Sequence, residues 1–164
     1  MRGRVKLNLA CGPRHLDGFE NLDLTNGWRF QDGLPYADGS VEAITESHGL
    51  YLLPIADWPH AFAEIARVLE PGGVVRITED ATDDRRSSRY GGFDGWVTLT
   101  SRGLVSVHLE AAGLDVKDCS PEWSYFKNGT DGSLIQEWHG EPPKVFHVEG
   151  IKQPNFEHER SRLR

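Results

Sequence analysis

Cysteine is scarce in this chain, and the sequence contains no recognisable metal-ligand motif. Cys11 and Cys119 are the two cysteines among 164 residues, too few to staple a domain with disulfides. Neither is paired with a histidine at the spacing of a metal site, and the seven histidines are scattered without a His-Glu-x-x-His motif. The composition therefore excludes a disulfide scaffold, and we expect no metal site.

Long hydrophobic runs are also lacking. No apolar stretch approaches the ~20 residues needed to cross a bilayer. The basic start of the chain, residues 1–6, is followed by strand-like residues and not by a secretory hydrophobic region. Hydrophobic residues still make up 38% of the chain, in short bursts that favour an ordered core. We expect one cytoplasmic domain over residues 1–153 and a polar tail over 154–164.

Positive charge is in short supply too. The formal net charge is -7, which argues against a general grip on the phosphate backbone of nucleic acid. Arg85, Arg86 and Arg89 lie close together in the sequence and would form a local basic patch. A solvated loop is the simpler interpretation of these three arginines, so nucleic acid is not favoured as a partner.

Short apolar segments bounded by Gly, Pro and Asp predict a series of β-strands. The predicted strands are residues 5–10, 19–24, a weaker 28–30, 41–45, 74–78, 114–116 and 144–151. Residues 34–40 and 128–132 carry turn chemistry. Most of these strands are followed by a loop, which is where sites form in α/β proteins.

Two helices are predicted between the later strands. The first covers residues 58–69, with Asp57 as a plausible N-cap and an apolar stripe at helical spacing, and residues 70–73 end it. The second covers residues 101–112 and ends at Gly113. Alternating strands and helices predict an open α/β sheet, in which ligands bind beyond the carboxyl ends of the strands.

The loop after the first predicted strand, Ala10-Cys11-Gly12, lets the backbone approach a ligand closely. A dinucleotide site would need Gly-x-Gly-x-x-Gly opening a well-formed helix, and of these glycines the chain has Gly12 alone. Asp23, at the end of the second strand, is placed to accept hydrogen bonds from ribose hydroxyls. The structural alternative is an aspartate that starts a turn, and after the Ala10–Gly12 bend we favour the ribose role.

Five sequence pieces occur in an order and spacing that together are fairly specific. They are residues 7–13 (LNLACGP), 21–23 (NLD), 34–42 (LPYADGSVE), 47–48 (SH) and 66–73 (ARVLEPGG). On these pieces the chain resembles the short, single-domain class I S-adenosylmethionine-dependent methyltransferases. The resemblance implies a Rossmann-like, mostly parallel, seven-stranded sheet with helices on both faces and an antiparallel last strand.

The resemblance also implies a site for S-adenosylmethionine. Ala10, Cys11 and Gly12 would touch the amino-acid part of the cofactor, and Asp23 would bind ribose. Asp32 would lie near the adenine, with Gln31 as the alternative, and Ser47 and His48 would border the cofactor and face the acceptor. Asn8 occupies the first acidic position of the usual motif, so it belongs to the same expected cofactor-binding set.

Three departures from the family pattern stand out. Asn8 replaces the usual acid, and Ala10 replaces the first glycine. The connection between the first two strands is short for a crossover that contains a helix. The usual second histidine after Ser47-His48 is missing, because residues 49–52 read GLYL.

Catalytic residues are not evident from the sequence, because methyl transfer relies largely on alignment and exclusion of water. His48, Glu79 and Asp80 are candidates: His48 as a base, and the two acids, expected to follow the fifth strand, as groups that orient an acceptor or cation. A structural histidine and a solvated acidic loop are the simpler interpretations. Two aromatic groups, residues 90–96 and 123–126, are candidate lid segments.

Two alternatives stay open at this point. The first is a non-catalytic S-adenosylmethionine-binding subunit with the same fold, serving an active partner. The second is a nucleotide-sugar or dinucleotide enzyme on a similar sheet. For an active enzyme, a small molecule, a sugar or a nucleotide suits this compact chain as acceptor, and its oligomeric state is not indicated by the sequence.

Overall fold

The computed structural model describes residues 4–80, 97–118 and 145–154. Several predicted features lie outside these ranges. They are the turn at 128–132, the arginines at 85, 86 and 89, the candidate lid segments 90–96 and 123–126, and the polar tail after residue 154. Within them, no helix is long and apolar enough to span a membrane.

A six-stranded sheet forms the centre of the described structure, in the order β2-β1-β3-β4-β6-β5. The strands are β1 (Val5–Leu9), β2 (Glu20–Leu22), β3 (Val41–Ser47), β4 (Leu69–Asp80), β5 (Leu114–Asp118) and β6 (Val145–Lys152). Strands β1 to β4 run parallel to one another, whereas β6 is antiparallel to both β4 and β5. The predicted antiparallel last strand is therefore confirmed.

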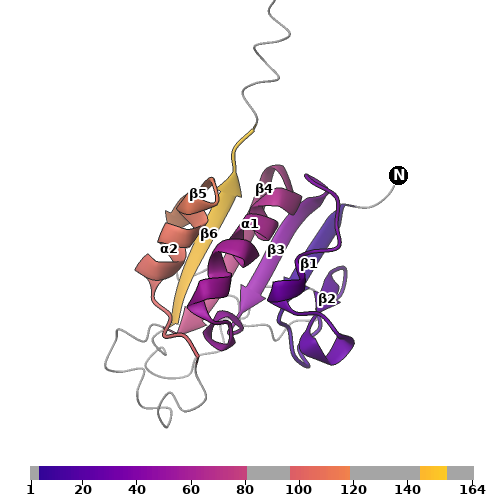
Figure 1. Cartoon of the computed structure of the whole chain (residues 1–164). Coiled ribbons are helices and arrows are strands. Elements are labelled where there is room, and N and C mark those ends of the chain that lie inside the picture. Colours follow the sequence, from indigo (N-terminus) through magenta and orange to yellow (C-terminus); the bar gives the residue numbers. More distant parts are fainter. Residues whose placement is uncertain (1–3, 81–96, 119–144, 155–164) are drawn as a thin grey trace, which may run out of the picture.

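Apolar residues that alternate along the strands face two helices on one side of the sheet (Figure 1). Leu7 and Leu9 of β1, together with Val75 and Ile77 of β4, have at most 1% of their surface exposed. The residues between them in sequence are polar and include Asn8, Arg76 and Thr78. This alternation gives the sheet one apolar face and one polar face.

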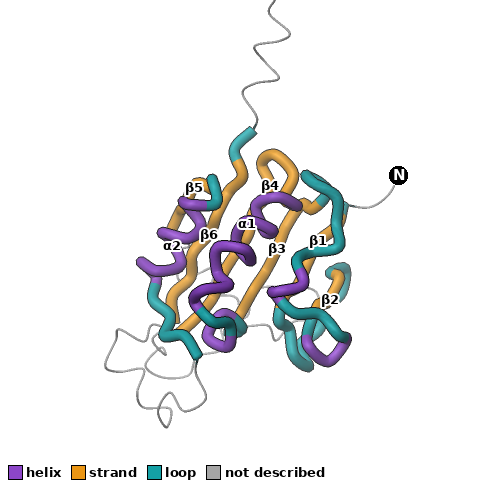
Figure 2. The backbone as a smooth tube through the Cα atoms, viewed as in Figure 1, coloured by secondary structure: helices purple, strands orange, loops and turns teal. Residues whose placement is uncertain are grey.

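The helices α1 (Trp58–Val68) and α2 (Arg102–Ala111) cover the apolar face (Figure 2). In α1 the buried side chains recur every three or four residues, as predicted. Trp58 packs edge-on against His108 of α2, with ring centroids 5.2 Å apart, which joins the two helices. Ser101 caps α2 by accepting a hydrogen bond from the Leu104 N–H. Both helix predictions are therefore confirmed within a residue or two at each end.

The seventh strand of the expected fold is not found in the described residues. Residues 28–30, predicted as a weak strand, lie in a turn followed by a 3-10 helix over Phe30–Asp32. Trp28 turns inward, donates its indole N–H to the Gly33 carbonyl and packs edge-on against Phe30. Trp28 and Phe30, on which the strand prediction rested, instead anchor a compact loop.

Helices on both faces were also expected, but in the described ranges α1 and α2 share one face (Figure 1). The physical reason is the short connection between β1 and β2, which has no helix. The Asn21 amide holds this connection by bonding the Leu16 N–H and carbonyl. Asn8, fully buried, donates to the Arg14 carbonyl and to Asn21 Oδ1. The side-chain amides of Asn8 and Asn21 therefore hold the β1–β2 connection in place without a crossover helix.

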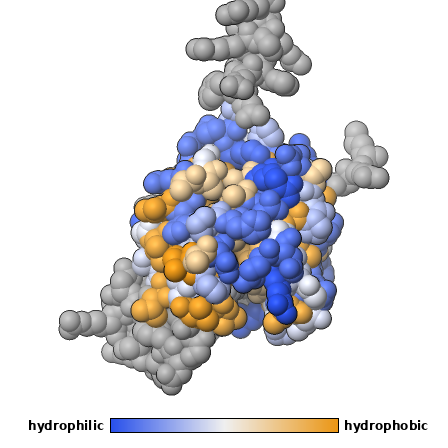
Figure 3. Space-filling model, in the orientation of Figure 1, coloured by the Kyte–Doolittle hydropathy of each residue, from blue (hydrophilic) through white to orange (hydrophobic). Residues whose placement is uncertain are grey.

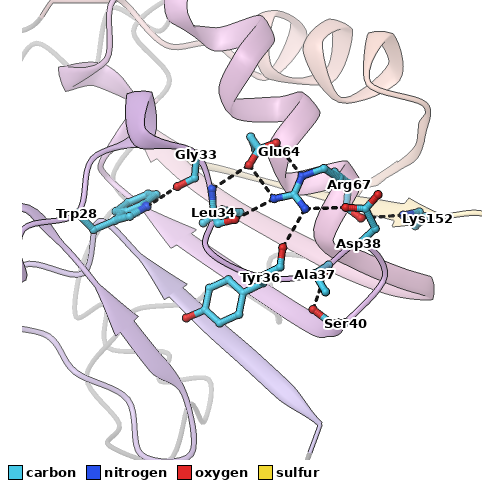
Figure 4. Close-up of polar contacts among 10 residues, drawn as sticks. All are labelled: Trp28, Gly33, Leu34, Tyr36, Ala37, Asp38, Ser40, Glu64, Arg67 and Lys152. Carbon is cyan, nitrogen blue, oxygen red and sulfur yellow. Dashed lines mark hydrogen bonds and ion pairs between the residues drawn. The ribbon is translucent and has the colours of Figure 1, made fainter.

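Arg67 of α1 fastens the loop before β3 to the helix layer (Figure 4). Its guanidinium donates to the Leu34 and Tyr36 carbonyls and to the Asp38 carboxylate, each at 2.7–2.8 Å. Glu64, one turn earlier, holds the same guanidinium and also accepts from the Leu34 N–H at 2.9 Å. Hydrogen bonds from Arg67 lower the pKa of Glu64 to about 2.

Exposed apolar side chains gather at one margin of the helix-covered face (Figure 3). The exposed large hydrophobic side chains of the described residues include Leu52, Ile55, Val97, Leu99 and Val107, each at least 46% exposed. The segment that begins at Val97 is fixed beside this margin, because the Val97 and Thr98 N–H groups donate to the Tyr51 carbonyl. Since residues 50–57 follow β3, the margin lies at the carboxyl end of the parallel strands.

We expect Arg67→Ala to destabilise the fold by about 2–3 kcal/mol, because it leaves two backbone carbonyls and a carboxylate without their donor. Arg67→Lys should recover part of this loss, since an ammonium lacks the planar fork. Chemical denaturation measures both. Arg4→Ala, which removes an exposed arginine 3.5 Å from Glu42, is the matched control and should cost less than about 0.5 kcal/mol.

We expect Asn8→Asp to destabilise the protein by about 2–4 kcal/mol at neutral pH, because a buried carboxylate would replace an amide donor. The new carboxylate would face the Arg14 carbonyl and Asn21 Oδ1 in a fully buried position. Protonation would restore one donor, so the deficit should shrink as the pH falls toward 4. Equal deficits at pH 7 and pH 4 in urea unfolding would contradict this account of Asn8.

Candidate functional site

A cavity of about 340 Å³ lies at the carboxyl ends of β1 and β3. Its lining residues come from the loop after β1 and the turn after β3, and are Ala10, Cys11, Gly12, Pro13, Arg14, Ser47 and His48. Five of these seven residues were expected at the cofactor, and Pro13 and Arg14 were not. The volume is at the lower end of the ~300–1,000 Å³ range of small-molecule sites.

The backbone around this cavity is held in left-handed conformations. Ala10 and His48 have φ angles of 49° and 59°, and they are the positive-φ residues other than glycine in the described structure. Such conformations cost about 1–3 kcal/mol and cluster at functional sites. Gly12, at φ 52°, has open space where a side chain would stand. The wall of the cavity at Gly12 is therefore bare backbone.

Asp23 follows β2 and lies close to this backbone wall. Its Oδ2 accepts from the Thr25 N–H and hydroxyl at 3.2 and 2.9 Å, capping a 3-10 helix over Leu24–Asn26. Partial burial raises the pKa of Asp23, but hydrogen bonds from Thr25 and from the backbone N–H groups of Gly12 and Leu24 outweigh it and lower the pKa. Asp23 is thus an ionised acid bonded to the loop after β1, and it is also the turn-starting aspartate of the alternative interpretation.

The other expected cofactor residues lie away from the cavity lining. Asn8 is committed to the β1–β2 connection. Gln31 donates to the Asp57 carboxylate at 3.2 Å, and Asp32 Oδ2 accepts from the Arg29 N–H. Asp57 is the N-cap residue of α1, as predicted, but its side chain makes no capping hydrogen bond. These polar groups organise the loop before β3 and its contact with α1.

A row of polar side chains crosses the sheet beside the cavity, on the face opposite α1 and α2. Ser47, Thr78 and His147 are successive partners across β3, β4 and β6. Ser47 Oγ lies 2.9 Å from His48 Nδ1, and Thr78 Oγ1 lies 2.9 Å from His147 Nδ1. The His48 N–H also donates to the Thr78 carbonyl at 2.9 Å. His48 is therefore fixed at both its backbone and its ring.

His147 is a site residue that sequence reasoning missed. Burial, together with the charge of His48, lowers the pKa of His147 to about 4. The sequence placed His147 within the last predicted strand, but it did not show the strand register that brings His147 beside Thr78. At neutral pH its ring is uncharged, so it offers a hydrogen bond and not a charge.

Glu79 and Asp80 were expected to follow the fifth strand, but they are the last residues of β4. The Glu79 side chain is fully buried, and its Oε1 accepts from the Gly49 and Leu50 N–H groups. Glu46, also fully buried, accepts from the same Gly49 N–H at 2.6 Å. Burial and the neighbouring Glu46 raise the pKa of Glu79 well above its usual range. Glu79 therefore holds the turn after β3 by accepting its backbone N–H groups. It is not among the residues that line the cavity.

No group of three or more potential metal ligands occurs among residues 4–80, 97–118 and 145–154. The polar groups that line the cavity are instead backbone atoms and the side chains of Arg14, Ser47 and His48, with the Asp23 carboxylate and the His147 ring on adjacent elements. Such a set suits a polar organic ligand held by hydrogen bonds, with a proton acceptor at its edge.

A family model described as a methyltransferase domain matches residues 26–77, about a third of the chain. The matched segment includes the loop held by Arg67, β3, the Ser47-His48 pair and α1. Residues 7–13 and Asp23 precede it. A search of curated proteins finds no significant match.

Solved structures show the same fold at low sequence identity. A chain from the complex of the Haloferax volcanii Trm112 methyltransferase activator with a methyltransferase is 16% identical (TM-score 0.61, covering 93% of this chain and 84% of that one). An S-adenosylmethionine-dependent methyltransferase from Archaeoglobus fulgidus is 11% identical (TM-score 0.64, covering 91% and 86%).

A third structure was solved with S-adenosylmethionine bound. It is the phosphoethanolamine N-methyltransferase 2 of Haemonchus contortus, 13% identical with a TM-score of 0.57, and the match covers 93% of this chain but 49% of that one. The chain thus spans about half the length of that enzyme. In fold, and over residues 26–77 in sequence, the chain is similar to the class I S-adenosylmethionine-dependent methyltransferases.

Proposed function

We propose that the protein is an S-adenosylmethionine-dependent methyltransferase that binds its cofactor in the cavity between the loop after β1 and the turn after β3. The proposal rests on three features that lie together at one edge of the sheet. They are the bare backbone at Gly12, the ionised Asp23 bonded to that backbone, and the left-handed His48 opposite.

The residues present fit this cofactor better than a dinucleotide. The connection after β1 has no helix whose N-terminus would hold a pyrophosphate, whereas an adenosyl sulfonium brings no phosphate. Ala10, Cys11 and Gly12 would hold its amino-acid part, and Asp23 would accept from the ribose hydroxyls. For the adenine we keep Gln31 and Asp32 as the proposed neighbours, because both lie on the loop that follows β2.

When bound, the cofactor supplies an electrophilic methyl group. The chain's own part is to align the acceptor and to exclude water at the edge of the cavity. His48, whose ring is oriented by Ser47, would take the proton from a hydroxyl or amine of the acceptor. His147, uncharged at neutral pH, would donate or accept a hydrogen bond beside it.

The acceptor class we propose is a small molecule, a sugar or a nucleotide with a hydroxyl or amine to be methylated. The alternative is a cofactor-binding subunit without activity of its own. It is favoured by Asn8 at the first acidic position of the expected motif and by the missing second histidine after Ser47-His48, where residues 49–52 read GLYL. The complex of the Haloferax relative with an activator is a precedent for assembly with a second chain.

The first test is cofactor binding by calorimetry with S-adenosylhomocysteine. We expect Asp23→Ala to weaken binding at least tenfold, which is about 1.4 kcal/mol, because the ribose hydroxyls lose their acceptor. Asp115→Asn, an exposed acid on β5, is the matched control and should bind like the wild type. Absence of binding by the wild type at millimolar ligand, or binding of NAD alone, would overturn the proposal.

Transfer of a labelled methyl group then separates the enzyme from the inactive subunit. Candidate acceptors of the three proposed classes are incubated with the wild type and with Asp23→Ala. Labelled product with the wild type alone supports the enzyme. Cofactor binding without any product, in the presence of each acceptor class, favours the subunit.

The lowered pKa of His147 predicts a pH dependence of stability. The neutral ring is favoured in the folded state, so this contribution is complete above about pH 6.5 and is lost as the pH falls toward 4. After discounting for solvent screening at a half-buried site, we expect a loss on the order of 1 kcal/mol by pH 5. Thermal unfolding at pH 7 and pH 5 should show a smaller decrease for His147→Gln than for the wild type. His15→Gln, at an exposed histidine, should decrease like the wild type.

A further inference from the structure

Two buried acids converge on the turn that forms one wall of the cavity. The Gly49 N–H lies 2.6 Å from Glu46 Oε1 and 2.9 Å from Glu79 Oε1, and the Leu50 N–H lies 2.7 Å from Glu79 Oε1. Both glutamates have 0% of their surface exposed. Two carboxyl groups therefore meet at one backbone donor on the helix-covered side of the sheet.

The surroundings of these two acids favour a proton on the pair, because burial and the neighbouring Glu46 raise the pKa of Glu79. Leu9 and Ile77 flank Glu46 on the neighbouring strands, and Phe146 is the partner of Glu79 on β6. Among the described residues, the charged group that acts on Glu79 is Glu46. Two anions in such a place would repel each other at low dielectric constant. With one proton, one group accepts the N–H bonds as a carboxylate while its neighbour stays neutral.

The turn that these acids hold touches the loop after β1. A Cβ atom at Gly49 would lie 2.4 Å from the Ala10 Cβ and 2.8 Å from Glu46 Oε1. Gly49 is thus wedged between the acid pair and a residue that lines the cavity. On its other side is His48, whose left-handed backbone also lines the cavity.

We propose that Glu46 and Glu79 are positioning residues that share one proton, lock the 48–50 turn against Ala10 and thereby set the shape of the cofactor cavity. The proposal deepens the proposed function and rests on it for the identity of the ligand. It assigns the acid pair no contact with cofactor or acceptor.

A consequence is that ligand affinity depends on the proton of the pair. Loss of this proton at alkaline pH leaves two buried anions at one N–H, which loosens the turn. Glu79→Gln imitates the protonated acid, because an amide oxygen accepts the same N–H bonds and its NH₂ group donates to Glu46. Glu79→Ala removes the acceptor of two N–H groups.

The experiment measures S-adenosylhomocysteine affinity by calorimetry at pH 7 and pH 9. We expect the wild type to lose affinity at pH 9, and Glu79→Gln to bind within twofold of the wild type at pH 7 with a smaller loss at pH 9. Glu79→Ala should bind at least tenfold more weakly at pH 7. Glu110→Gln, an exposed acid on α2, is the matched charge control and should follow the wild type.

A second readout needs no ligand. The NMR signals of the Ala10 methyl group and the His48 ring should move in Glu79→Ala, and those in Glu79→Gln should stay close to the wild type. If the wild type does not bind the ligand, the proposed function fails while these signals still test the positioning role.

Wild-type affinity together with unmoved Ala10 and His48 signals in Glu79→Ala would overturn the inference. Should Glu79→Ala not fold, the pH comparison decides: an equal loss of affinity at pH 9 in the wild type and Glu79→Gln would overturn it as well.

Discussion

The guanidinium of Arg67 is the interaction on which the architecture most depends. Between β2 and β3 the chain runs through nearly twenty residues with only short 3-10 turns, and nothing in their hydrophobic pattern alone would fix their path. Arg67 binds two carbonyls and a carboxylate of this segment, while Glu64 binds both the guanidinium and the segment's own N–H. Because α1 carries both side chains, packing of the helix on the sheet also positions the loop that leads into β3 and, through β3, the turn at His48.

Over the described residues, the fold is similar to that of S-adenosylmethionine-dependent methyltransferases. The connection between β1 and β2 contains no helix, and two asparagine amides supply the hydrogen bonds that keep it in place. Asparagine suits position 8 because both atoms opposite its Nδ2 are oxygens, so a donor is required. A residue expected at the cofactor therefore has a structural role in the β1–β2 connection.

The sequence was informative where a pattern has a local physical cause. The apolar residues of 41–45 and the stripe of α1 follow from burial on one face, whereas the ribose role of Asp23 and the close approach at Gly12 stay predictions, because an aspartate that starts a turn fits the same sequence. Trp28 and Phe30 were misread as a strand, since aromatic residues are favoured both in strands and as loop anchors. His147 and the Glu46–Glu79 pair could not be found, because they depend on register between strands far apart in the chain. The lid segments predicted at 90–96 and 123–126 stay predictions.

The position of β6 between β4 and β5 bears on how the molecule is made. Strands β1 to β4 pair with neighbours that are synthesised within the first eighty residues, so this half can assemble while the ribosome is still at work. Strand β5 joins the sheet through β6, whose residues begin at Val145. The sheet is therefore completed late, because the pairing of β6 with β4 joins distant parts of the chain and such pairings form slowly. Until β6 pairs, the exposed edge of β4 can pair with other chains and aggregate. The same late strand brings His147 beside Thr78, so the polar row next to the cavity is completed after the loop that follows β1.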